Sequence, residues 1–245
     1  MAPSESLIAH LIELRKRLLN AVVALLLVFA CLFPWASDLY ALLAQPLLAK
    51  LPQGGQMIAT DVTTPFFVPL KVAMMAAFLI TLPYILYQIW RFIAPGLYAH
   101  EKRLVAPLVI ASTLLFFSGM AFAYFAVFPV VFGFITAAAP QGVAVMTDID
   151  KYLGFVLGMF LAFGVTFQVP VAVVVLVRMG VVSVEKLREI RSYVIVGAFI
   201  IGAIFTPPDV VSQFMLAIPL WLLYEAGIVV AVWMGKGKTK EAEPR

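Results

Sequence analysis

Six long apolar runs, separated by short polar connections, limit what this chain can fold into. Most of them reach the length of about 20 residues that an α-helix needs to cross the hydrocarbon core of a bilayer. They leave too little chain between them for a soluble domain, and the mean hydropathy of +1.05 lies far above that of water-soluble domains. The runs cover residues 18–35, 66–89, 104–127, 152–177, 193–205 and 211–234.

These runs predict an all-α integral membrane protein in which six transmembrane helices form one domain over residues 1–245. Continuous runs exclude a membrane β-barrel, which needs short segments of alternating hydrophobicity. An amphipathic segment at about residues 4–17 precedes the first span, and a cytoplasmic tail follows the last at about residues 235–245. Between the first two spans, about residues 36–65 are rich in leucine, so we expect a structured outer cap instead of a flexible linker.

The fifth run is short. Its 13 residues would form a helix of about 20 Å, against a hydrocarbon core of roughly 30 Å. We expect a short fifth and a short sixth helix, which would thin the bilayer locally or leave a flank for a partner helix to cover.

The distribution of basic residues predicts the orientation. Only Lys50, Lys71 and Lys151 of the 17 lysines and arginines fall on one side of the predicted spans. The positive-inside rule therefore places both termini in the cytoplasm. It also explains the net charge of +4 better than nucleic-acid binding does, because the cations lie at the ends of spans.

Residue types that an enzyme would need are missing. His10 and His100 are the only histidines, and Cys31 is the only cysteine, so neither a zinc motif nor a disulfide framework can form. We expect no catalytic site, no metal and no cofactor. A small secondary carrier of unknown solute remains the alternative function, although no internal repeat is visible and Lys71 and Glu225 lie near the edges of their spans.

The connection at residues 88–103, QIWRFIAPGLYAHEKR, is the best candidate for a binding surface. Glu101 lies there among basic residues, and Glu13 is a second acidic exception on the same side. Each carboxylate could accept charge-assisted hydrogen bonds from arginine, and two such sites would select a peptide with paired arginines. Two other interpretations stay open: Glu101 as a surface carboxylate neutralised by its neighbours, and Glu13 in an ordinary pair with Arg17, four residues away.

One polar residue lies deep in a span. Gln168 is followed by Pro170, which removes a backbone donor and predicts a kink. The amide is either a polar contact for a ligand or part of a hydrogen bond between neighbouring helices.

Five segments, spread over nearly the whole chain, carry a family resemblance: HLIELRKRLLN at 10–20, TDVTTPFF at 60–67, FIAPGLYAHEKR at 92–103, GMAFAYF at 119–125 and FTPPDVVSQ at 205–213. In their order and spacing they resemble the TatC family, the receptor subunit of the twin-arginine protein translocase.

The resemblance implies a glove-shaped six-helix bundle in the bacterial inner membrane that binds the twin-arginine signal peptides of folded cargo from the cytoplasmic side. Glu101 matches the carboxylate that contacts the arginine pair in that family. The other residues that match signal-peptide positions are Phe92 and Pro95 of the same loop, and Glu13, Arg15 and Arg17 of the N-terminal segment.

The resemblance also implies partners. Thr206 and Gln213 match a polar patch where single-span subunits of the TatA and TatB type dock, and Pro46 and Asp209 match outer positions that affect transport. The resemblance further implies that the chain lies in a lipid bilayer, that it associates with copies of itself, and that the proton-motive force drives export. The chain departs from the family at Gln168, because the family often has a glutamate there that faces the concave surface. Gln168 would accompany the apolar part of the signal peptide.

Overall fold

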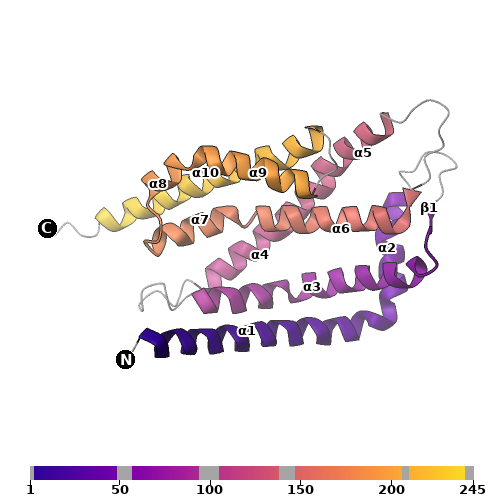
Figure 1. Ribbon diagram of the computed structural model, residues 1–245, viewed down its shortest axis with the longest axis horizontal. Coiled ribbons are helices and arrows are strands. Elements are labelled where there is room, and N and C mark those ends of the chain that lie inside the picture. Colours follow the sequence, from indigo (N-terminus) through magenta and orange to yellow (C-terminus); the bar gives the residue numbers. More distant parts are fainter. Residues whose placement is uncertain (1–2, 49–56, 94–104, 138–146, 206–209, 241–245) are drawn as a thin grey trace. The chain divides into compact units, whose positions relative to one another are not determined.

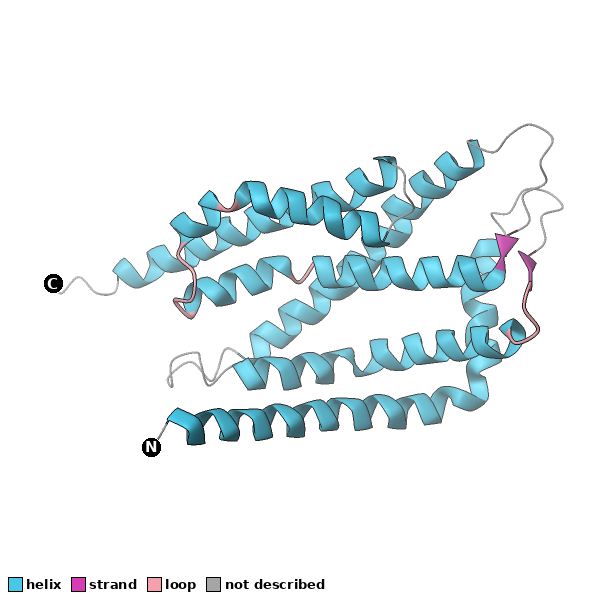
Figure 2. Cartoon of the chain, in the orientation of Figure 1, coloured by secondary structure: helices cyan, strands magenta, loops and turns pink. Residues whose placement is uncertain are grey.

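The computed structural model describes residues 3–48, 57–93, 105–137, 147–205 and 210–240. Nearly all of these residues are helical, and the rest form two two-residue strands and short turns (Figures 1 and 2). The elements are α1 Pro3–Leu32, η1 Phe33–Trp35, α2 Ala36–Leu48, β1 Met57–Ile58, α3 Thr64–Ile93, α4 Val105–Phe122, η4 Ala123–Val127, α5 Phe128–Ala137, β2 Thr147–Asp148, α6 Ile149–Thr166, α7 Val169–Arg178, α8 Val184–Glu189, α9 Arg191–Phe205 and α10 Val210–Lys240.

The helices confirm an all-α membrane protein. Among the described residues, five segments are long and apolar enough to cross a bilayer, and α9, with 15 residues, is shorter than these, as predicted. The sixth run differs from the prediction of a short helix. In the structure α10 has 31 residues, and its apolar part, Val210–Met234, has 25, which is enough to cross the hydrocarbon core without thinning it.

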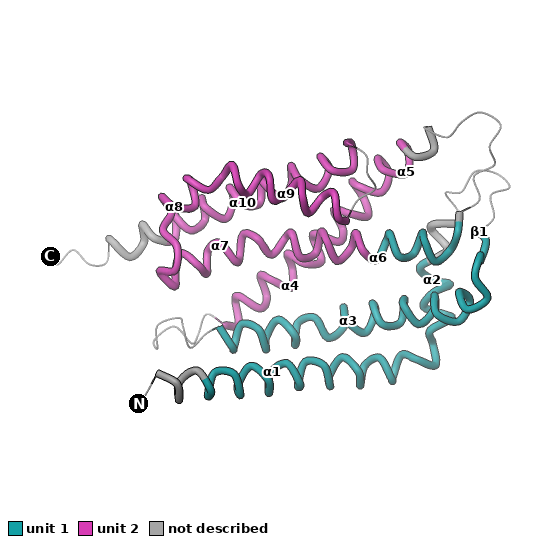
Figure 3. The backbone as a smooth tube through the Cα atoms, in the orientation of Figure 1, with its two compact units in different colours: residues 1–95, 139–157 teal, residues 96–138, 158–245 magenta. Residues whose placement is uncertain are grey.

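The contacts within the chain divide it into two compact units (Figure 3). Unit 1 comprises Met1–Pro95 and Ala139–Leu157, and unit 2 comprises Gly96–Ala138 and Gly158–Arg245. The division falls inside α6, so the two units share one continuous helix. A single six-helix domain stays a prediction.

In unit 1, α1 packs along α3, and the outer cap folds back onto the start of α3. A small apolar core joins Val68 and Val72 of α3 to Leu153 of α6, and Leu39, Tyr40 and Leu43 of α2 pack against it. Strand β1 pairs in parallel with β2, with Met57 opposite Thr147. The described part of the cap is therefore structured, because its leucines and its tyrosine find apolar partners within the same unit.

The N-terminal segment is not a separate surface helix. It is continuous with the first span in α1, and its polar face, which carries His10, Glu13 and Arg17, turns towards α3. Its leucines are exposed instead, with Leu11 at 60% and Leu18 at 62%. The polar side of this segment thus packs against protein, and its leucines are free to face lipid.

In unit 2, α10 packs between α7 and α9. Glycines permit close approach: a Cβ added at Gly227 would lie 2.9 Å from Pro170 Cα, and one at Gly119 would lie 2.5 Å from the Phe163 carbonyl oxygen. The predicted kink is present, since α6 ends at Thr166 and α7 starts at Val169, with proline in its first turn. The third span contains one π-helical turn, Ala123–Val127.

Candidate functional site

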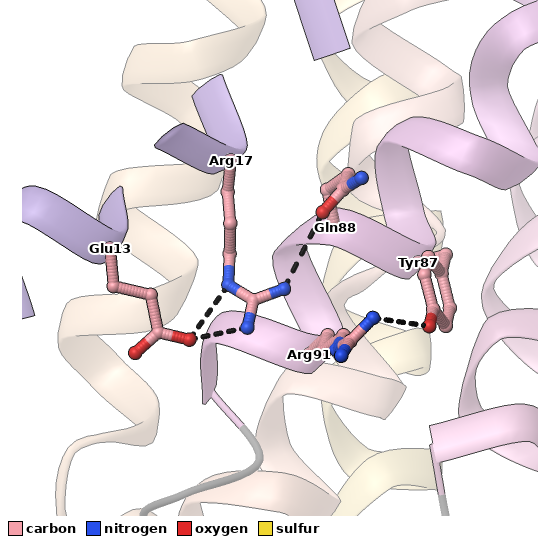
Figure 4. A network of polar contacts seen from close by, with 5 residues as sticks. All are labelled: Glu13, Arg17, Tyr87, Gln88 and Arg91. Carbon is pink, nitrogen blue, oxygen red and sulfur yellow. Dashed lines mark hydrogen bonds and ion pairs between the residues drawn. The ribbon is translucent and has the colours of Figure 1, made fainter. Parts of the chain in front are cut away.

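A polar network lies where α1 meets α3 within unit 1 (Figure 4). The Arg17 guanidinium donates through Nε to Glu13 Oε1 at 3.0 Å, and its Nη2 donates to the same oxygen. Its remaining nitrogen, Nη1, lies 3.4 Å from Gln88 Oε1 on α3. The network therefore joins two residues one helical turn apart on α1 to a residue 71 positions away in the chain.

The burial of this network distinguishes it from a surface ion pair. The Arg17 side chain is only 16% exposed and that of Glu13 36% exposed, and Gln88 is 7% exposed. A pair four residues apart on a solvated helix contributes only a few tenths of a kcal/mol. Because Arg17 is largely shielded and also contacts α3, its interaction with Glu13 is stronger than the ordinary pair considered from the sequence.

Arg91 and Phe92 flank the network at the same end of α3. Arg91 donates to the Tyr87 hydroxyl at 2.9 Å, and its guanidinium carbon lies 5.8 Å from the centre of the Tyr87 ring. The Phe92 ring stacks on His10 of α1, with 4.3 Å between ring centres. The structure thus brings three of the predicted residues, Glu13, Arg17 and Phe92, to one end of the α1–α3 pair.

Other predicted residues of the signal-peptide site are not part of this network. Arg15 is exposed on α1. Glu101 and Pro95 lie outside the described residues. Sequence reasoning missed Gln88, because its partner Arg17 lies 71 positions away and no local pattern links the two residues.

Gln168 occupies the break between α6 and α7 in unit 2. Its Nε2 donates to the backbone carbonyl of Ser112 on α4 at 2.8 Å. Its Oε1 is buried and has no hydrogen-bond partner among the described residues. The amide therefore makes the hydrogen bond between neighbouring helices that the sequence left open, and it keeps one acceptor oxygen for a further donor.

A second group of charges, which sequence reasoning did not single out, lies in unit 1 where β2 leads into α6. Lys71 Nζ lies 2.5 Å from Asp150 Oδ1, so this lysine near the edge of its span is paired with a carboxylate. Asp148 accepts from the backbone N–H groups of Asp150 and Lys151 at 2.9 and 3.0 Å, which caps α6. A cavity of about 360 Å³ opens between these residues and the turn at 60–64.

The Asp148 carboxylate also binds the hydroxyl and the backbone N–H of Thr60. The side-chain hydrogen bond from Thr60 is the main cause that lowers the pKa of Asp148 from 3.8 to about 2, and the backbone N–H groups add to it. An aspartate just before a predicted helix is an N-cap signal, which could have identified this residue from the sequence.

The proposed docking and outer positions are only partly described. Gln213 lies in the first turn of α10, where α9 approaches closely: a Cβ at Gly202 would lie 3.4 Å from the Gln213 carbonyl oxygen. At the other end of α9, Arg191 forms a two-pronged ion pair with Glu225, with nitrogen-to-oxygen distances of 2.6 Å. Thr206 and Asp209 lie outside the described residues, and so does the side chain of Pro46. Within the described residues, no three His, Cys, Asp or Glu side chains gather as metal ligands would.

Residues 9–219 match the model of one family, described as Sec-independent protein translocase protein (TatC). The chain is 55% identical over 239 residues to the Sec-independent protein translocase protein TatC of Escherichia coli strain K12, covering 97% of this chain and 93% of that protein. It is 56% identical over 222 residues to the protein of the same name from Azotobacter chroococcum, covering 91% and 87%.

Solved structures agree with the sequence relatives. A crystal structure described as the twin-arginine translocase receptor TatC in DDM superposes with a TM-score of 0.82 at 41% identity, over 91% of this chain and 99% of that one. A second crystal structure of that receptor gives a TM-score of 0.81 at 42% identity.

Proposed function

The chain belongs to the TatC family of Sec-independent protein translocase proteins, and from that membership we propose that it is the receptor for twin-arginine signal peptides. It is a multi-pass membrane protein of the bacterial inner membrane and a component of the twin-arginine translocase, not an enzyme. As the receptor, it binds the signal peptides of folded cargo at the cytoplasmic face, and both of its termini lie in the cytoplasm.

The observation that carries this proposal is the environment of Glu13. Its carboxylate already accepts two N–H groups from one guanidinium, at a partly shielded position where α1 meets α3. A carboxylate placed in this way suits arginine, whose planar fork presents paired donors, better than lysine. In the proposed site Glu101 supplies the second carboxylate for the arginine pair, and Phe92, Pro95, Arg15 and Arg17 surround the two acids.

Other parts of the chain serve partners in the same proposal. Gln168, at the break between α6 and α7, accompanies the apolar part of the signal peptide. Thr206 and Gln213 dock single-span subunits of the TatA and TatB type beside the short α9, while Pro46 and Asp209 act on the outer side. Export driven by the proton-motive force further requires self-association of the chain with these subunits, because one bundle of this size cannot enclose a wide pore.

Crosslinking tests the central residue of this site. A twin-arginine signal peptide with a photoreactive group should crosslink to the native chain in membranes, and Glu101→Gln should reduce the yield by roughly tenfold or more, since a charge-assisted hydrogen bond is lost. Glu185→Gln is the matched control, because Glu185 is an exposed glutamate of α8 on the side proposed to be cytoplasmic. Undiminished crosslinking of Glu101→Gln would remove Glu101 from the site, and absence of crosslinking to the native chain would reject the receptor function.

A further inference from the structure

We infer that Arg17 is an internal occupant of the Glu13 carboxylate, so that a signal-peptide arginine reaches this acid fully only by displacing it. The inference rests on the proposed receptor function and adds a residue that sets the affinity of the same site. Arg17 thereby acts as a built-in competitor of the ligand.

The geometry of the pair supports this assignment. A carboxylate oxygen has two lone pairs, and Glu13 Oε1 accepts from both Nε and Nη2 of Arg17. That oxygen has no room for a further donor. Glu13 Oε2 has no partner among the described residues, so an incoming guanidinium could bind Oε2 while Arg17 stays in place. It could bind both Oε1 and Oε2 only after Arg17 has left.

Gln88 makes the displacement possible. A guanidinium that loses its carboxylate in a shielded place is costly unless another acceptor takes it. The Gln88 amide oxygen already lies 3.4 Å from Arg17 Nη1, at the outer limit of a hydrogen bond, and it is held in place by burial on α3. Arg17 can therefore move from Glu13 to Gln88 by a change of its side chain alone.

The other cation on α3 near this acid is already engaged. Arg91 donates to the Tyr87 hydroxyl, as Figure 4 shows, and its guanidinium carbon lies 5.8 Å from the centre of the Tyr87 ring. His10, the remaining basic group of this helix face, stacks on Phe92. Among the described residues, only Arg17 makes hydrogen bonds to Glu13 that a signal arginine would have to replace.

The cost of displacing Arg17 is the same for every ligand that takes both oxygens. If both a twin-arginine and a twin-lysine peptide displace Arg17, Arg17 should weaken the binding of both by the same factor. It therefore does not create a preference for arginine over lysine. Such a competitor keeps the complex weak enough to release cargo, since affinity changes of this kind appear mainly in the dissociation rate.

Equilibrium binding to the full chain in lipid nanodiscs tests the inference. With a fluorescent twin-arginine signal peptide, Arg17→Gln should bind about threefold to tenfold more tightly than the native chain, because a charge-assisted contact no longer has to be broken. Lys16→Gln is the control, since it removes the same charge from the neighbouring exposed position and should change the dissociation constant less than about twofold. In a Glu13→Gln background, Arg17→Gln should have no effect beyond that control.

The opposite results would overturn it. Weaker binding of Arg17→Gln, or tightening no larger than that of Lys16→Gln, would show that Arg17 assists the ligand or is indifferent to it. Arg17→Lys keeps the charge but offers a single point contact, so it should bind the peptide with an affinity between those of the native chain and Arg17→Gln. This variant replaces Arg17→Gln as the test if Arg17→Gln fails to fold. The proposed function fails separately, when the native chain binds no twin-arginine peptide or Glu101→Gln leaves binding unchanged.

Discussion

Asp148 shows how a single carboxylate joins two segments of the chain that are far apart in sequence. It accepts two hydrogen bonds from Thr60 and two from the first turn of α6. All four favour the ionised form, which is why the pKa of this group falls to about 2. The charge of Asp148 therefore contributes to the stability of unit 1 where Thr60 meets the start of α6.

Asp148→Asn should consequently lower the melting temperature in detergent at neutral pH. Because the folded pKa lies below the unfolded value of 3.8, the contribution is complete above that value and disappears as the pH falls towards about 2. Melting curves of the native chain and the variant should thus converge over this range. Asp38→Asn, at an exposed position of α2, is the control, and a constant gap between the native and Asp148→Asn curves down to the acid limit would contradict the account.

Gln168→Glu gives the second test at the residue scale. An ionised carboxylate cannot donate to the Ser112 carbonyl, so the interhelical hydrogen bond is lost and two acceptors face each other. We expect a loss of about 1–3 kcal/mol of stability, the usual cost of a buried unsatisfied group, seen as a lower melting temperature in detergent. An unchanged melting curve would mean that water reaches this position.

Some of the site was predictable from the chain. Glu13 and Arg17 are one helical turn apart, which predicts their pairing. Gln88 and Asp150 were not predictable as partners of Arg17 and Lys71, because those contacts join residues 71 and 79 positions apart and depend on how helices pack. Local spacing determines contacts within a helix and carries no information about which helices meet.

The apolar runs predict where the membrane spans lie, but the helices of the structure begin and end at other residues than the runs do. Helix α1 starts at Pro3, well before the first apolar run, because its polar face finds partners on α3. Helix α10 continues past Met234 to Lys240, through six residues that carry no apolar side chain. Hydropathy marks where a helix meets lipid and does not mark where its hydrogen bonds end.

Close packing of α4 against α6 depends on Gly119. In Gly119→Ala, the new methyl group would lie 2.5 Å from the Phe163 carbonyl oxygen, so the backbones must separate at a cost of about 1–3 kcal/mol. Gly158→Ala on α6 is the matched control, since nothing lies within 4 Å of its added Cβ and alanine favours helix. Thermal unfolding of the pair should show a loss for Gly119→Ala and no loss for Gly158→Ala; equal melting temperatures would contradict the packing described.

For the whole molecule, the proposed orientation can be checked by labelling. In a Cys31→Ser background, a single cysteine at Lys240 should react with a membrane-impermeant maleimide only after the cells are lysed. A single cysteine at Lys50 should react in intact spheroplasts, because this position lies on the other side of the predicted spans. The reverse pattern would place residues 88–103 outside the cytoplasm and remove them from the path of cargo.

The central claim is recognition of paired arginines, and one binding ratio tests it most directly. The full chain in lipid nanodiscs is titrated with a twin-arginine signal peptide and with the same peptide carrying two lysines. Because an ammonium cannot reproduce the paired donors of a guanidinium, the arginine peptide should bind roughly tenfold more tightly or better. Equal dissociation constants for the two peptides, or no measurable binding of either, would contradict the account.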